Sequence, residues 1–474
     1  MKDKLDFYIN GEWVSSSSAE TIEVVNPATE EVIGSIGAGT KEDINNAVSA
    51  AKEAFKTFSK TTAHERAEYI RSIIDIYERR MDEIASTITE EMGSPLWLSQ
   101  VAQATTGMSH FKSTLKELEN YEFEKNLNNY IERKEAIGVV GMITPWNWPM
   151  NQMCTKVASA IAAGCTMVIK PSEISPYCGI LLAEIIHEAG LPKGVFNLVN
   201  GYGPIVGAAL SESPDVDMIS ITGSTRAGIA VAQASAPSVK RVSQELGGKS
   251  ANIVLDDANI EKAVASGVAQ CFLNTGQTCT APTRMLVSAA NYDKAIEIAK
   301  SVAEKTSTGD PLDENSRMGP ISNKAQYEKV VRMIQIGIDE GATLVAGGTE
   351  LPEGLDKGFY VKPTVFANVT NDMTIAREEV FGPVLCMLKY ETEEEAIEIA
   401  NDTDYGLAGY VQGEVSHAQE VARHIRAGQI TINGGNRENA APFGGYKASG
   451  NGREHGLHGL EDYLETKALI SPLG

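Results

Sequence analysis

The sequence predicts an α/β protein, because short β-rich runs alternate with helical patterns through much of the chain. The first series of apolar runs occupies residues 138–144, 166–170, 195–200, 218–222 and 251–255. The helices between these runs are expected to begin near Asn151, Pro176, Pro204 and Thr225. Such alternation is typical of βαβ units, which build a parallel sheet.

A second alternating series begins after residue 279 and indicates a second α/β unit. Its apolar runs occupy residues 285–288, 343–346, 384–390 and 429–433. A chain of 474 residues has room for two or three domains. Two α/β domains are therefore the simplest interpretation of the pattern.

The first third of the chain is predicted to be mostly helical. Residues 41–60 have the spacing of an amphipathic helix, and a longer helix is expected over 66–92, ending at Gly93. A third helix is expected over 96–120. The polar and charged segment 121–136 fits neither pattern. A hairpin that projects from the body and a solvated loop are both compatible with it, and composition alone favours the loop.

Charge and composition exclude several classes of partner. The formal net charge is −22 and the sequence pI is near 4.8, so the surface repels nucleic acid and anionic lipid. Residues 1–14 lack the apolar core of a secretion signal, and the longest apolar stretch, 157–169, is too short to cross a bilayer. We therefore expect a cytoplasmic protein that binds neither nucleic acid nor a membrane.

The six cysteines predict neither a zinc site nor a disulfide framework, because none forms a CxxC pair. No metal is therefore expected. Cys279 differs from the others because it lies in a polar, glycine-containing turn over residues 274–280. Most free cysteines are small buried hydrophobic residues. A nucleophilic thiolate needs backbone donors and a path to solvent, and a polar turn is compatible with both.

Two glycine-rich turns follow predicted strands. Gly203 and Gly207 come after the run ending at Asn200, but the third glycine of a dinucleotide fingerprint is expected where Val206 stands. The second turn, residues 223–228, offers Ser224 or Thr225 as a helix cap that leaves backbone N–H groups for a phosphate. Each turn, taken alone, is more often structural than functional. The same holds for Glu245 beside its Gly-Gly turn, since a lone glutamate is usually solvated or ion-paired.

Seven short blocks give these patterns weight together. They are TPWNWP at 144–149, KPSE at 170–173, GSTxxG at 223–228, ELGGK at 245–249, GQTC at 276–279, EEVFGP at 378–383 and PFGGYK at 442–447. Each block alone is a weak pattern, but seven in this order are hard to explain by chance. The order is that of the aldehyde dehydrogenase superfamily, which the chain closely resembles along essentially its whole length.

The resemblance implies a three-part fold. A Rossmann-like NAD-binding domain is expected over residues 1–120 and 137–247, and an α/β catalytic domain over 248–448. Residues 121–136 and 449–474 are expected to form a small β arm for oligomerisation. A homodimer or homotetramer follows from this arm.

The resemblance also implies a reaction, the NAD(P)-dependent oxidation of a small-molecule aldehyde to a carboxylic acid. Cys279 is expected to attack the aldehyde carbon. The Asn147 amide, together with the backbone N–H of Cys279, is expected to stabilise the oxyanion. Glu245 is expected to activate the water that hydrolyses the resulting thioester.

A set of residues is expected around the dinucleotide by the same resemblance: Ile143, Trp146, Lys170, Glu173, Gly203, Gly207, Gly223, Ser224, Gly228, Leu246, Glu379 and Phe381. Lys170 and Glu173 are expected to bind the adenosine ribose, and Glu379 the nicotinamide ribose. Glu173 favours NAD over NADP, because a carboxylate accepts hydrogen bonds from a 2′-hydroxyl and repels a 2′-phosphate. Lys170 keeps NADP as the alternative.

The expected substrate pocket departs from that of relatives that oxidise apolar aldehydes. Asn151, Gln152, Thr155 and Arg437 align with positions that are often apolar there, while Phe443 is retained. Unpaired polar groups against an alkyl chain are costly, so a substrate with a polar or anionic group several atoms from its aldehyde carbon is predicted. The alternative is that these side chains lie at a wide, wet mouth and touch no substrate.

Three other functions compete with this reading. A CoA-acylating aldehyde dehydrogenase typically lacks the glutamate found here as Glu245. A cysteine hydrolase would pair Cys279 with a histidine such as His455 or His458, but no catalytic-histidine signature is evident. A non-catalytic protein of the same fold would not need Cys279, Glu245 and Asn147 together.

Overall fold

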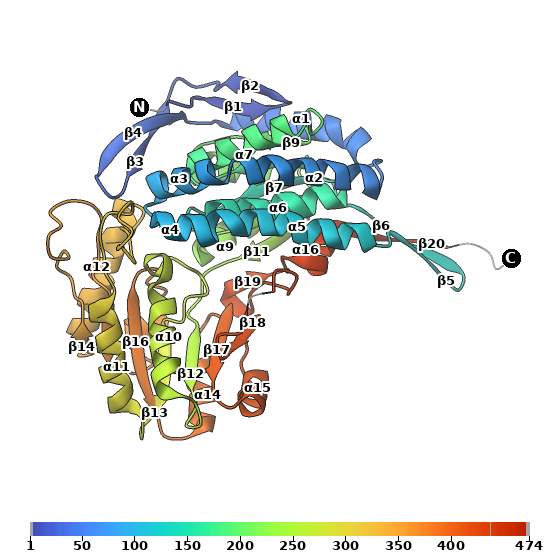
Figure 1. Ribbon diagram of the computed structural model, residues 1–474. Helices are drawn as coiled ribbons and strands as arrows, with labels where there is room; N and C mark the ends of the chain where they lie inside the picture. Colours follow the sequence, from blue (N-terminus) through green and yellow to red (C-terminus); the bar gives the residue numbers. More distant parts are fainter. Residues whose placement is uncertain (1–2, 437, 471–474) are drawn as a thin grey trace.

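The computed structural model describes residues 3–436 and 438–470, which form two α/β bodies and a projecting arm (Figure 1). The first body is built on an eight-stranded sheet. Its parallel centre consists of β11 (Arg241–Glu245), β10 (Met218–Thr222), β7 (Val139–Ile143), β8 (Thr166–Lys170) and β9 (Phe196–Leu198), in that order. Antiparallel strands extend both edges: β19 (Gly450–Asn451) beside β11, and β1 (Asp6–Ile9) with β2 (Glu12–Ser15) beside β9.

The helices of the first body mostly follow the predicted pattern. They are α1 (Lys41–Phe58), α2 (Ala63–Arg79), α3 (Met81–Met92), α4 (Leu96–Leu98), α5 (Ala104–Asn120), α6 (Pro149–Ala163), α7 (Pro176–Glu188), α8 (Ala208–Glu212), α9 (Thr225–Ser235) and α16 (Gly456–Asp462). The single helix expected over 66–92 is wrong, because the chain leaves helical geometry at Arg80 and starts again as α3. Gly93 ends α3 in the left-handed conformation (φ 79°), as predicted.

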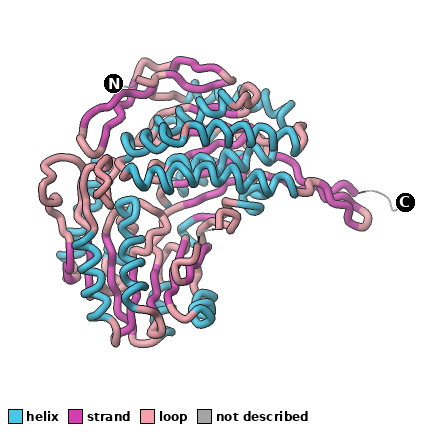
Figure 2. The backbone as a smooth tube through the Cα atoms, in the orientation of Figure 1, coloured by secondary structure: helices cyan, strands magenta, loops and turns pink. Residues whose placement is uncertain are grey.

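The helix expected over 96–120 also has a break that the pattern does not reveal. A π-helical turn, η1 (Ser99–Gln103), separates α4 from α5. Ahead of these helices, the strands β1 and β2 and the ribbon of β3 (Thr21–Asn26) and β4 (Glu31–Gly37) were not predicted (Figure 2).

The second body contains a seven-stranded sheet. Its order is β14 (Thr343–Ala346), β15 (Thr364–Ala367), β16 (Val384–Tyr390), β13 (Arg284–Ser288), β12 (Ala251–Val254), β17 (Ala408–Gln412) and β18 (Gln429–Ile432). All neighbours are parallel except β14 and β15. The accompanying helices are α10 (Ile260–Phe272), α11 (Tyr292–Lys305), α12 (Lys324–Asp339), α13 (Thr374–Arg377), α14 (Glu393–Asn401) and α15 (Val415–Arg423).

One apolar run belongs to a different sheet from the one expected. Residues 251–255 were grouped with the first series, but β12 lies between β13 and β17 in the second sheet. The strand beside β10 is β11, which pairs in register from Met218–Arg241 to Thr222–Glu245 and was not predicted. The strand was missed because Arg241, Gln244 and Glu245 interrupt its apolar pattern.

The arm is a three-stranded sheet of β5 (Glu124–Leu127), β6 (Tyr130–Ala136) and β20 (Leu464–Ile470), which extends from the first body (Figure 1). The hairpin interpretation of 121–136 is therefore confirmed against the loop, and its turn contains Asn128 at φ 47°. The segment from 449 onward contributes β20 to the arm, whereas β19 and α16 pack on the first body. Within the described residues, no helix is long and apolar enough to cross a membrane.

Candidate active site

Most of the residues expected around the dinucleotide, together with the predicted base Glu245, lie at one edge of the first sheet, whereas Glu379 and Phe381 come from the second body. Trp146 follows β7, Lys170 ends β8, Ser224 follows β10, and Glu245 ends β11. Because these strands are parallel, their carboxyl ends lie at the same edge, where open α/β sheets bind ligands.

A cavity of about 180 Å³ opens beside this edge. It is lined by Pro145, Trp146, Asn147, Gln152, Thr222, Gly223, Ser224, Leu246, Gly247, Cys279, Gln326, Lys329, Glu379 and Phe381. The rings of Trp146 and Phe381 meet edge to face, with centroids 5.4 Å apart. The Gly248 N–H donates to Glu379 Oε1 over 2.9 Å. Burial raises the pKa of Glu379, and this N–H partly offsets the rise.

The second glycine turn is shaped by packing and capping. Ser224 Oγ accepts a hydrogen bond from Ala227 N at 3.2 Å and so caps α9, as predicted. A Cβ on Gly228 would lie 2.6 Å from Leu246 Cδ2, so this position needs glycine for close packing. Gly203 is different, because a Cβ there would have no neighbouring atom within 4 Å. A Cβ on Gly207 would lie 3.6 Å from Ile143 Cδ1, which is an ordinary contact distance.

Lys170 and Glu173 form an ion pair of 2.7 Å. The Lys170 side chain is 5% exposed and that of Glu173 is 28% exposed. The Glu173 side chain is therefore partly open to solvent at the edge of the sheet, and the buried Lys170 ammonium pairs with its carboxylate.

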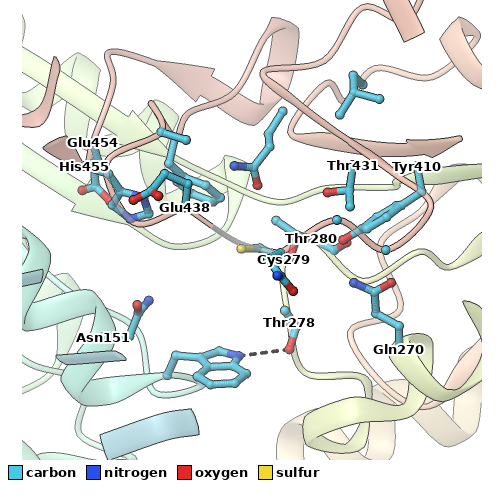
Figure 3. Close-up of a pocket in the computed structure, with 18 of the residues that line it drawn as sticks. Asn151, Gln270, Thr278, Cys279, Thr280, Tyr410, Thr431, Glu438, Glu454 and His455 are labelled. Atoms are coloured by element: carbon cyan, nitrogen blue, oxygen red, sulfur yellow. Dashed lines mark hydrogen bonds between the residues drawn. The ribbon is translucent and has the colours of Figure 1, made fainter. Parts of the chain in front are cut away.

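A larger cavity of about 560 Å³ lies on the other side of Cys279 (Figure 3). Five carboxamide side chains are in its wall: Asn151, Gln152, Gln270, Gln429 and Asn436. Its other lining residues are Trp148, Thr278, Cys279, Thr280, Tyr410, Ile430, Thr431, Ile432, Gly434, Gly435, Glu438, Ala441, Phe443, Glu454 and His455. The wall is therefore rich in neutral hydrogen-bonding groups.

Three of the five residues named for the substrate pocket line this cavity, namely Asn151, Gln152 and Phe443. Arg437 lies outside the described residues. Thr155 is buried on α6 and is not in the wall. His110 Nε2 and Asn151 Oδ1 are 2.7 Å apart, and the His455 ring stacks on Phe443 with centroids 5.1 Å apart.

Several lining residues were missed by sequence reasoning. Gln270 lies on α10, Tyr410 on β17 and Thr431 on β18, and none of them belongs to one of the seven blocks. Glu438 and His455 come from loops near the C-terminus. No local pattern distinguishes such side chains from other surface or core residues, and only their convergence in space identifies them.

Cys279 is at the junction of the two cavities and is partly exposed, whereas the other five cysteines are buried. Its loop has an unusual backbone, because Asn274, Thr275 and Gly276 are all left-handed, with φ of 56°, 56° and 70°. A Cβ on Gly276 would lie 2.1 Å from the carbonyl oxygen of Gly382. The loop is therefore pressed against the block 378–383, and only glycine fits at the contact.

Asn147 is buried beside this loop. Its Nδ2 donates to the carbonyl oxygen of Gln277 at 3.0 Å. Its own carbonyl oxygen accepts from Asn274 Nδ2 at 2.9 Å and from Gln103 Nε2 at 3.2 Å. The side chain is thus held two residues from Cys279.

Glu245 is 3% exposed, so the solvated position that its residue type suggests is wrong. Within the described part of the chain, neither carboxylate oxygen has a hydrogen-bond partner. Burial raises the pKa of Glu245 well above the usual range, and the nearby Glu454 carboxylate raises it further. Lys156, which forms a buried ion pair with Glu454, opposes these effects. An unpaired buried carboxylate with a raised pKa is typical of a general base.

Glu245 and the Cys279 loop are connected through the backbone. Gly248, three residues after Glu245, lies so close that a Cβ there would be 2.4 Å from the carbonyl oxygen of Cys279. On the other side, a Cβ on Gly444 would lie 2.8 Å from Glu245 Oε1. The glycines of two sequence blocks therefore permit two close approaches, one of Gly248 to the Cys279 backbone and one of Gly444 to the Glu245 carboxylate.

The model of the aldehyde dehydrogenase family matches residues 13–469. The chain belongs to this family. It is 50% identical over 472 residues to a 3-succinoylsemialdehyde-pyridine dehydrogenase from a Pseudomonas species, covering 99% of both chains. The family and these comparisons make the protein an oxidoreductase that oxidises aldehydes with NAD.

Solved structures of related enzymes have the same fold. A cysteine-to-alanine mutant of aldehyde dehydrogenase C from Pseudomonas syringae, in complex with NAD+ and octanal, superimposes with a TM-score of 0.98. It is 50% identical, over 98% of this chain and 96% of that one. The NAD+ complex of the Bacillus cereus aldehyde dehydrogenase gives a TM-score of 0.96 at 38% identity, over 99% and 97% of the two chains.

Proposed function

We propose that the enzyme converts its aldehyde to a carboxylic acid through an acyl group carried on Cys279 and released by water that Glu245 activates. The supporting observation is that Cys279 belongs to the walls of both cavities, one expected to hold NAD and the other the aldehyde. Within the described residues, only Gln152 shares this position.

In the first step, the Cys279 thiolate attacks the carbonyl carbon and a C–S bond forms. The carbonyl π electrons move to the oxygen, which becomes an oxyanion. The Asn147 amide and the Cys279 backbone N–H stabilise this charge. A neutral amide donor suits this task because it does not protonate the oxyanion.

The cavity of about 180 Å³ suits NAD in several ways. The capped N-terminus of α9 offers backbone N–H groups beside Ser224 to a phosphate. The open surface at Gly203 leaves room for the adenosine, and Glu173 and Glu379 are acceptors for ribose hydroxyls. NAD held there would supply the hydride acceptor. Loss of hydride from the carbon bound to Cys279 leaves a thioester.

Glu245 acts in the last step. Its carboxylate removes a proton from water, the hydroxide attacks the thioester carbon, and the C–S bond breaks to release the acid. The absence of a hydrogen-bond partner on either carboxylate oxygen leaves both lone-pair sets available to a water. A raised pKa also makes Glu245 a stronger base than a solvated glutamate.

Mass spectrometry of the Glu245→Gln variant tests this scheme. After mixing with NAD and hexanal, the variant should accumulate one hexanoyl group on the peptide that contains Cys279. The Cys279→Ala variant, treated in the same way, should carry none. An acyl group on a different residue, or turnover that strictly requires CoA, would contradict the hydrolytic route. Ester turnover with no NAD-dependent oxidation of hexanal would instead favour a cysteine hydrolase.

We also propose that the substrate carries a polar group several atoms from its aldehyde carbon. The carboxamides in the cavity wall support this, because they can donate hydrogen bonds to a polar substrate group and accept them from it, whereas an alkyl chain offers no such bond. Asn151 already uses its Oδ1 on His110, so the other four carry this argument. The name of the 3-succinoylsemialdehyde-pyridine dehydrogenase also describes a heteroatom-rich aldehyde. The octanal complex of the P. syringae enzyme represents the opposite case.

A comparison of kcat/KM tests this substrate class. Hexanal is compared with aldehydes of similar length that end in a hydroxyl or a carboxylate. The polar aldehydes should be preferred, and Arg437→Ala should reduce the preference for the carboxylate alone, because arginine binds carboxylates through two N–H donors. A preference for hexanal would contradict the proposed class, while an unchanged ratio in Arg437→Ala would remove only Arg437 from it.

We infer that the first body is the NAD-binding domain, residues 1–120 and 137–247 with β19 and α16 added, and that the second body is the catalytic domain, residues 248–448. The arm of β5, β6 and β20 is the proposed oligomerisation element of a homodimer or homotetramer. Its outer strand β20 has one unpaired edge within the described residues, and such an edge can pair with another chain.

A further inference from the structure

The π-helical turn η1 (Ser99–Gln103) interrupts the helical segment from α4 to α5. Such turns contain an extra residue, are less favourable than α-helix and are frequent at functional sites. Gln103 is the last residue of the turn, and its side chain is fully buried at 0% exposure. Glutamine is seldom buried completely, so this position needs an explanation from its contacts.

The contacts of Gln103 lead directly to the Cys279 loop. Its Nε2 donates to the carbonyl oxygen of Asn147 at 3.2 Å and to Asn274 Oδ1 at 3.0 Å, and it also lies 3.5 Å from Met92 Sδ. Both oxygen partners are acceptors, which fixes the orientation of the Gln103 amide. Its Oε1 has no hydrogen-bond partner within the described part of the chain. The Nε2 amide group of Gln103 is therefore fully used as a donor, while its buried Oε1 accepts no hydrogen bond from the described residues.

Asn274 extends the same network. Its Nδ2 donates to the carbonyl oxygens of Asn147 and Gln277, at 2.9 and 3.2 Å, so its own amide orientation is also fixed. Its left-handed backbone, φ 56°, directs the side chain toward these partners. Asn147 is thereby held at its backbone by Gln103 and Asn274, and at its side chain by the carbonyl of Gln277.

We propose that Gln103 is a positioning residue for the oxidation step. It fixes the backbone of Asn147 relative to Asn274, so that the amide of Asn147 is aligned with the reacting carbon on Cys279. The role rests on the proposed function of Asn147 as an oxyanion donor. The π-helical turn explains how an element of the first body brings this amide to the loop of the second.

The Gln103→Met variant tests the role, because methionine is similar in length and volume but has no N–H donor. We expect kcat with NAD and hexanal to fall about 10- to 100-fold, since small misplacements of a catalytic group have effects of this size. KM for NAD and the melting temperature should change little. The matched control is Ser99→Ala, in the same turn, which removes the hydrogen bond from Thr89 Oγ1 to Ser99 Oγ and does not touch Asn147.

The Gln103→Glu variant adds a measurement that a purely structural role would not affect. A protonated glutamic acid can donate one hydrogen bond to the same acceptors, whereas its carboxylate repels both. The ratio of its kcat to that of the wild type should therefore rise as pH falls. A flat ratio would overturn the proposal.

Three other outcomes separate this proposal from the proposed function. A kcat within twofold of wild type in Gln103→Met, together with an inactive Asn147→Ala, would reject Gln103 and keep the oxyanion role. Equal losses in Gln103→Met and Ser99→Ala would show a general effect of the turn and also reject the proposal. A fully active Asn147→Ala would reject both.

Discussion

The two cavities that meet at Cys279 have walls of different construction. The smaller wall is made largely of strand ends and glycine turns, and the backbone of Gly247 lies close to the Glu379 carboxylate. The larger wall is made of side chains from helices, strands and loops of both bodies, and five of these are carboxamides. Side chains in the larger wall can change without moving the backbone, whereas changes in the smaller wall disturb the turns themselves. Mutations should therefore have graded effects on the substrate side and severe effects near the junction.

The largest effect is expected for Cys279→Ala, because this residue belongs to both walls. The rate of NADH formation should fall by at least about 10³-fold, since the covalent route loses its nucleophile. NAD binding, followed by tryptophan fluorescence, and the melting temperature should be nearly unchanged. The control variant Cys271→Ala, which alters a buried thiol of α10, should keep the wild-type rate of NADH formation. An equal loss of activity in the control would indicate damage to the fold instead.

The next largest effect is expected for Glu245→Gln, which should slow acyl hydrolysis by about 10²- to 10⁴-fold. The wild-type hydrolysis rate should rise with pH through the raised pKa of Glu245, because only the ionised carboxylate accepts the proton of water. Below that pKa the group is protonated and the rate falls. Stopped-flow detection of an NADH burst measures this step.

The control for this experiment is Glu438→Gln, which alters a carboxylate in the substrate wall and keeps the base. It should retain the pH dependence of hydrolysis, and the Glu245→Gln variant should lose it. A pH dependence that survives in Glu245→Gln would assign the base to another residue.

On the cofactor side, Glu173→Gln should raise the NADP-to-NAD ratio of kcat/KM by about tenfold, because the repulsion of a 2′-phosphate is removed and Lys170 becomes free to bind it. The comparison variant is Glu379→Gln, which alters a carboxylate in the wall of the smaller cavity. It should weaken the use of NAD and NADP by similar factors, since both cofactors contain the same nicotinamide ribose. Comparable kcat/KM values for the two cofactors in the wild type would contradict the role of Glu173.

The smallest effect is expected in the substrate wall. Gln270→Leu should shift the kcat/KM ratio of hexanal to 6-hydroxyhexanal toward hexanal by roughly 3- to 10-fold, the size of a single pocket contact. KM for NAD should stay the same, because Gln270 lines only the larger of the two cavities. A change in KM for NAD would contradict the separation of the two walls.

The difference between the walls also explains what could be predicted from the sequence. The turns at Gly248 and Gly276 leave a local signal, because a short approach to backbone permits only glycine there. The alternation of strands and helices predicted two α/β units for the same local reason. Gln270 and Tyr410 carry no such signal, since nothing in their neighbourhood along the chain depends on the cavity.

Two further features were beyond sequence reasoning because they depend on tertiary contacts. The strand β11 has a polar end, and Glu245 is buried there only because the loop containing Gly444 covers it. The π-helical turn before α5 follows no apolar pattern, and the position of Gln103 becomes meaningful only beside Asn147 and Asn274. Glu245 and Gln103 are both buried, although glutamate and glutamine are usually exposed to solvent.

The uneven burial of the thiols has a practical consequence for handling the enzyme. Burial raises the pKa of the cysteines other than Cys279, namely Cys154, Cys165, Cys178, Cys271 and Cys386, and so suppresses their thiolates. A thiol reagent should therefore consume one equivalent per subunit in the native protein and six after denaturation. The first equivalent counts functional active sites directly. It also means that mild oxidation silences the enzyme while the folded state persists, and a reductant that reverses a sulfenic acid or mixed disulfide restores it.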